Sequence, residues 1–161
     1  MRWMNAACAI RAAGLILAFG LAWPAIAGPM EDFLTAYNRQ EYATTVRLLK
    51  PLADQGDAVA QTSLGRMYAN GQGVPKDDAQ AVKWSRLAAD QGYAMAQVNL
   101  GSMYANGQGV PRDYVLAYMW LNLGAAGGLE LGRKNRDFIA PLMTLTDISE
   151  AQRLSREWKP K

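Results

Sequence analysis

Residues 60–92 read AQTSLGRMYANGQGVPKDDAQAVKWSRLAADQG, and residues 96–128 read AQVNLGSMYANGQGVPRDYVLAYMWLNLGAAGG. The two stretches align at an offset of 36 residues and are identical at 19 of 33 positions. A repeat of this size indicates an array in which one supersecondary unit stacks on the next. Such arrays present extended binding surfaces. The repeat therefore predicts the architecture and favours binding over catalysis.

The first half of each copy is patterned as a helix. Ala60, Leu64 and Tyr68 recur every fourth residue and predict a helix over 58–69. The following loop, 70–75, contains two glycines that supply positive φ and ends in a proline that prevents the helix from continuing. The second copy predicts the equivalent helix over 94–105.

The second half of each copy predicts a second helix. Asp77 is suited to cap a helix that runs to Gln91, and Asp113 begins the equivalent helix, which runs to Ala126. Four residues of the first of these helices are expected to face inward: Ala81, Trp84, Leu87 and Ala88. Helical spacing likewise predicts that the recurring aromatic residues pack in the core rather than stack on a sugar: Tyr68, Trp84, Tyr104 and Trp120.

Gly65 and Gly101 fall inside the predicted first helices. Glycine in a helix interior costs roughly 1 kcal/mol relative to alanine. Its recurrence at the same position predicts a packing reason, namely the close approach of a neighbouring helix.

The flanking sequence extends the array in diverged form. Residues 28–57 predict a first hairpin, with helices over 29–38 and 42–55. Residues 130–161 predict capping helices that cover the open end of the array. The first would span 130–143, with Pro141 near its end, and the second 148–158, capped by Thr146 or Asp147.

Residues 1–27 have the pattern of a secretory signal peptide. Arg2 and Arg11 precede an apolar run, and small residues at 25–27 suit cleavage before Gly28. The apolar run is shorter than the roughly 20 residues of a spanning helix. The sequence thus predicts a protein that is exported to the periplasm or secreted, with no stable membrane insertion after cleavage.

Charge and composition exclude several functions. Removal of Arg2 and Arg11 with the leader would reduce the 17 basic residues to 15, against 14 acidic residues. A net charge this close to zero predicts no electrostatic attraction to nucleic acid. The chain has no histidine, and its single cysteine, Cys8, lies in the predicted leader. We therefore expect no disulfide, no cofactor, no metal site and no nucleophilic catalytic residue.

The repeat motif resembles the Sel-1-like repeat family, a short-helix relative of tetratricopeptide repeats, in a secreted bacterial form without cysteines. The first copy carries Leu64-Gly65…Tyr68…Gly71-x-Gly73-Val74-Pro75-x-Asp77…Trp84, and the second repeats it 36 residues later. The resemblance implies an all-α fold, a right-handed α/α solenoid with repeats at 58–93 and 94–129. It also implies a non-enzymatic scaffold for protein–protein interaction.

Positions that differ between the copies are the candidates for binding. On the face of the first helix opposite the predicted core, we expect a concave groove to be lined by Gln61, Thr62, Arg66, Gln97, Val98 and Ser102. The partner would be a segment of another protein in the cell envelope.

Two other functions fit an exported protein. One is binding of a cell-wall fragment (a muropeptide) or another small ligand. The other is glycan hydrolysis by carboxylates of the tail: Glu130, Glu150 and Glu157.

Overall fold

The computed structural model describes residues 28–161, and within this range all regular structure is helical. The expected leader, residues 1–27, lies outside the described part of the chain. The elements are α1 (Pro29–Asn38), α2 (Tyr42–Asp54), α3 (Ala58–Asn70), α4 (Asp78–Asp90), α5 (Ala94–Asn106), α6 (Tyr114–Ala126), α7 (Glu130–Ile139), the 3₁₀ turn η1 (Ala140–Leu142) and α8 (Leu145–Glu157).

Aspartates fix the starts of three helices. Asp57, Asp77 and Asp113 have extended backbones, and each side chain accepts a hydrogen bond from a backbone N–H three residues on, at 2.7 to 2.9 Å. These bonds satisfy N–H groups that have no partner inside the helix. The predicted cap at Asp77 is confirmed.

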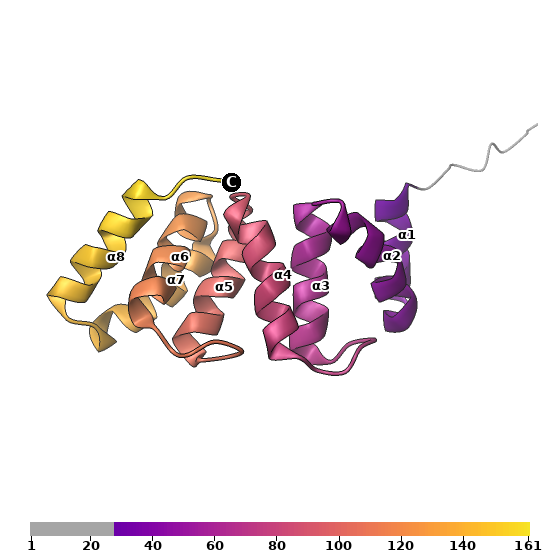
Figure 1. Cartoon of the computed structure of the whole chain (residues 1–161), viewed down its shortest axis with the longest axis horizontal. Helices are drawn as coiled ribbons and strands as arrows, with labels where there is room; N and C mark the ends of the chain where they lie inside the picture. The colour runs from indigo at the N-terminus through magenta and orange to yellow at the C-terminus, as the bar shows by residue number, and fades with distance from the viewer. Residues whose placement is uncertain (1–27) are drawn as a thin grey trace, which may run out of the picture.

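The helices stack in chain order as a solenoid (Figure 1). Each packs mainly against its neighbours in sequence from α1 to α7, and α3 also touches α5, as α5 touches α7. We call α1, α3, α5 and α7 the A helices and α2, α4 and α6 the B helices. The predicted all-α solenoid is confirmed.

The core follows the repeat. Trp84 and Trp120 are 5% and 4% exposed, and Tyr104 is also buried. These three aromatic residues are core, as expected, and Tyr68 is half-buried against the same clusters. The prediction for Leu87 was wrong: it is 42% exposed, because Ala88 and Ala89 take the buried face of α4 at this level.

The helix glycines lie where two helices meet. A Cβ added to Gly65 would be 3.1 Å from Ala81 O, and one added to Gly101 would be 3.0 Å from Ala117 O and 2.7 Å from Leu121 Cγ. Backbone oxygens of a packed helix cannot move away cheaply. The predicted close approach of a neighbouring helix is confirmed for both glycines.

The tail differs from the expected plan in two details. The first helix ends at Ile139 and continues as the 3₁₀ turn, with Pro141 inside that turn rather than at the end of one long helix. The last helix begins earlier than expected, because Thr144 caps it. Its Oγ1 accepts from the N–H of Asp147, whose carboxylate in turn accepts from the N–H of Thr144.

The last helix closes the array from the B side. Both α7 and α8 pack on α6. Trp158, just beyond α8, meets Trp120 edge to face, with ring centroids 6.1 Å apart. The chain then returns to α4, where the backbone N–H of Lys161 donates to Asp90 O at 2.8 Å (Figure 1). The tail thereby covers apolar surface of α6.

The longest of the described helices have 13 residues. Within residues 28–161, none combines the length and the hydropathy that crossing a bilayer requires.

Candidate functional site

Three hollows follow one another along the A helices. The first lies between α1 and α3 and has a volume of about 280 Å³. The second lies between α3 and α5 (about 160 Å³), and the third between α5 and α7 (about 230 Å³). Arg66 lines the first two, and Ser102 lines the last two. We call this row of hollows the A-face groove.

The repeat register explains why these residues coincide. Arg66 and Ser102 are 36 residues apart, and a further step of 36 gives Phe138, which lines the third hollow from α7. Ser63, Asn99 and Asn135 form a second such series, and each lines a hollow. The groove therefore uses equivalent positions of three A helices.

Sequence reasoning missed Asn135 and Phe138. The sequence of α7 has lost the repeat motif, so its residues were assigned only to a capping helix. The signal was nevertheless present, because α7 begins at Glu130, which is 36 residues after the start of α5. Carrying the period one step past the last recognisable copy identifies both residues.

Four of the six predicted groove residues are buried, which corrects that prediction. Gln61 and Gln97 are 4% and 3% exposed, and Thr62 and Val98 are 7% and 1% exposed. Arg66 is exposed and Ser102 half-buried, and both line the groove.

The buried glutamines connect consecutive repeats. Gln61 Nε2 donates to Ala53 O at 3.0 Å, and Gln97 Nε2 donates to Ala89 O at 3.3 Å. Each bond joins an A helix to the end of the preceding B helix. A buried amide requires such a partner, so these side chains face the neighbouring repeat and not the groove.

Thr62 and Val98 are also buried in the helix stack. Thr62 Oγ1 donates to Ala58 O at 2.7 Å within its own helix. Val98 fills the space above two glycines, since a Cβ added to Gly124 or Gly132 would be 2.5 or 3.1 Å from Val98 Cγ2.

The middle hollow shares the groove's charge with the first, since Arg66 lines both, and five of its seven lining residues are polar. Its lining includes Arg66 from α3 and Asn99 from α5. The Arg66 guanidinium stands 5.5 Å from the centre of the Tyr37 ring. Within residues 28–161, no carboxylate forms an ion pair with Arg66, and neither side chain takes part in a hydrogen bond between side chains.

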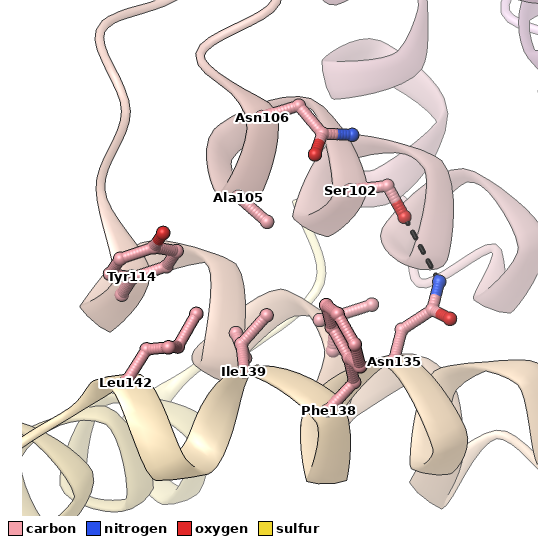
Figure 2. Close-up of a pocket in the computed structure, with 9 residues that line it drawn as sticks. Ser102, Ala105, Asn106, Tyr114, Asn135, Phe138, Ile139 and Leu142 are labelled. Carbon is pink, nitrogen blue, oxygen red and sulfur yellow. Dashed lines mark hydrogen bonds between the residues drawn. The ribbon is translucent and has the colours of Figure 1, made fainter.

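The first hollow is mainly apolar, and the third is lined by apolar and polar side chains together. Figure 2 shows the third, where Asn135 and Phe138 of α7 face Ser102 and Ala105 of α5. Asn135 Nδ2 donates to Ser102 Oγ at 3.2 Å, which fixes one rim. Phe138 is 78% exposed. The first hollow is lined by apolar residues of α1, α2 and α3, including Phe33, Leu34, Leu49, Val59 and Met67.

The tail carboxylates do not form an acid–base pair suited to glycan hydrolysis. A hydrogen bond from Arg133 lowers the pKa of Glu130, and one from Arg153 lowers the pKa of Glu150. Arg153 also pairs with Glu157 at 2.5 Å. A general acid needs a raised pKa, whereas the bonds from Arg133 and Arg153 lower the pKa values of Glu130 and Glu150.

Metal ligands are not gathered in the described part of the chain. Residues 28–161 contain no group of three or more acidic, histidine or cysteine residues arranged to hold an ion.

The chain has relatives of known structure. A protective antigen of uropathogenic Escherichia coli strains, which displays an SLR fold, is 32% identical, with a TM-score of 0.76 over 81% of this chain. A Sel1 repeat protein from Oxalobacter formigenes is 24% identical, with a TM-score of 0.66 over 81% of this chain. The chain spans 28% and 54% of the lengths of these two proteins. Among curated proteins, none matches the sequence.

Comparison with protein families identifies residues 58–93 and 94–129 as Sel1 repeats. These stretches hold α3 with α4 and α5 with α6, the two hairpins at the centre of the groove. The chain therefore contains two Sel1 repeats, a kind of repeat that commonly mediates protein–protein interaction.

Proposed function

We propose that the protein is a non-enzymatic adaptor that binds a segment of another protein in the A-face groove. The row of three hollows along equivalent positions of the A helices carries this proposal. A row of hollows built from successive repeats suits a partner that also extends in one direction.

Exposed apolar side chains along the A helices support the proposal. Val59, Met95 and Leu131 occupy the second position of α3, α5 and α7 and are 37%, 40% and 51% exposed. On each helix, one groove residue follows this position by one helical turn and a second groove residue follows it by two turns. The exposed apolar residue therefore lies on the same face of the helix as the groove residues. Phe138 and Leu142 extend the apolar surface at the third hollow, at 78% and 58% exposed. Apolar patches of this kind mark interaction sites.

We further propose that the adaptor works in the cell envelope. The signal-like pattern of residues 1–27 supports this location. In the producing cell, we expect the protein in the periplasmic or secreted fraction, with Gly28 as its first residue by N-terminal sequencing. A protein that retains residues 1–27 and fractionates with the cytoplasm would contradict the proposal.

Site-specific photo-crosslinking tests the groove. A photo-reactive amino acid is placed at Ser63 or Ser102 in the groove, and at Arg47 or Lys83 on exposed faces of α2 and α4 as matched controls. We expect one protein to be captured from both groove positions and from neither control.

The captured protein should also be lost when the groove is filled. Ser102→Trp places a bulky side chain where the second and third hollows meet. Equal capture from the control positions, or capture that Ser102→Trp leaves unchanged in a folded protein, would contradict the proposed function.

A further inference from the structure

We propose that the A-face groove selects an extended segment that has an acidic residue at its centre and an apolar residue about three positions to either side. This inference rests on the proposed adaptor function and adds the chemistry of the partner. It is carried by the charge of Arg66, which lines the first and the middle hollow, by hydrogen-bond donors of the middle hollow that have no partner, and by the apolar residues that line the first and the third hollow.

Arg66 is the only charged residue that lines any of the three hollows in the described structure. The groove therefore has a positive centre and no acidic residue to neutralise it. An arginine without a carboxylate is a ready partner for one, since its planar guanidinium can donate two parallel hydrogen bonds. The charge predicts an acidic side chain opposite Arg66.

Two other polar side chains of the middle hollow are already occupied, whereas the buried Ser85 Oγ there has no hydrogen-bond partner in the described structure. Gln108 Nε2 donates to Asp78 Oδ1 at 2.8 Å, and Ser102 Oγ donates to Val98 O at 3.0 Å while it accepts from Asn135. Arg66 and Asn99 remain as donors on opposite walls, one from α3 and one from α5. A carboxylate has two oxygens and accepts from both donors at once.

The outer hollows require apolar residues on both sides of the acid. Leu34, Val59 and Met67 line the hollow before Arg66, and Phe138, Ile139 and Leu142 line the one beyond Ser102. Burying apolar side chains there contributes roughly 25 cal/mol for each Å² removed from water. The acid supplies selectivity, and the flanking residues supply contact area.

The spacing follows from the stacking of the A helices. Packed helices lie about 8–10 Å apart, and an extended chain advances about 3.3 Å per residue. Three residues therefore connect adjacent hollows. Hollows of about 160 to 280 Å³ admit individual side chains, whereas a whole helix is about 10–12 Å wide.

Selection from a display library of random twelve-residue peptides tests this chemistry. The purified protein, Arg66→Glu and a control, Arg47→Glu, are each used as bait. Arg47 is exposed on α2, outside all three hollows, so its reversal changes the net charge equally without changing the groove. Circular dichroism establishes that all three baits are folded.

We expect the protein and Arg47→Glu to enrich peptides with Asp or Glu between two apolar residues. Arg66→Glu should enrich Lys or Arg at the central position with the same apolar neighbours. For one selected acidic peptide, fluorescence anisotropy should show binding about 10- to 100-fold weaker to Arg66→Glu than to the protein, as expected for loss of a charge-assisted hydrogen bond.

The outcomes separate this inference from the proposed function. Groove-dependent peptides that lack an acid, or whose central residue is unchanged in Arg66→Glu, would overturn the inference and leave the adaptor function standing. Selected peptides that bind Ser102→Trp as well as the protein would overturn both.

Discussion

Trp120→Ala is expected to lower the free energy of unfolding by about 3–5 kcal/mol, the usual cost of deleting a large buried aromatic side chain. Trp120 is 4% exposed and lies between the second repeat and the tail, in edge-to-face contact with Trp158. Loss of the Trp120 ring would leave a cavity between α6 and the segment that follows α8, which contains Trp158. Because domains are stable by only about 5–15 kcal/mol, urea unfolding followed by circular dichroism should show a large shift of the midpoint.

Phe138→Ala is the matched control for this prediction. It also removes an aromatic ring, but Phe138 is 78% exposed in the groove. Its unfolding free energy should stay within about 0.5 kcal/mol of the parent, while partner binding should weaken. Equal destabilisation by the two substitutions would contradict the assignment of Trp120 to the core and of Phe138 to the binding surface.

Gly109→Ala is expected to cost roughly 2–5 kcal/mol, because backbone strain and a steric clash add. Gly109 has φ +69°, and a Cβ placed there would be 2.2 Å from Asp78 O. Gly73 stands in the same relation to Tyr42, at 2.4 Å. The loop of each repeat thus rests directly on the first turn of the preceding B helix, and the substitution separates two repeats.

Gly56→Ala supplies the comparison that isolates the clash. Gly56 also has a positive φ, +96°, but nothing lies within 4 Å of a Cβ built on it. Only the conformational strain remains, at about 1–2 kcal/mol. If both variants unfolded at the same urea concentration, the loop contact between repeats would have no energetic role.

The sequence predicts the helices well because their signals are local. An aspartate cap such as Asp77 and glycines such as Gly71 mark the ends of helices whichever way the helices pack. The repeat added the long-range information, since residues that recur at the same position must meet equivalent neighbours. Trp84 and Trp120 could therefore be assigned to the core without a structure.

The groove could not be located equally well, because burial depends on both neighbours of an A helix. Gln61 is buried because both ends of its amide find partners outside its own helix, Ala53 O from the preceding repeat and the Nε2 of Gln91. Leu87 has the spacing of a core residue, but it is 42% exposed. The third wall of the groove was missed because α7 keeps the register of the repeat while losing its sequence.

The most direct test of the A-face groove is to map where a bound segment contacts the protein. Backbone amide chemical shifts would be recorded by NMR before and after addition of a peptide selected by the protein. Our account predicts that the largest changes lie on the A helices, around Ser63, Arg66, Asn99, Ser102 and Phe138. Changes concentrated on the exposed faces of α2, α4 and α8, with the A helices unaffected, would contradict it.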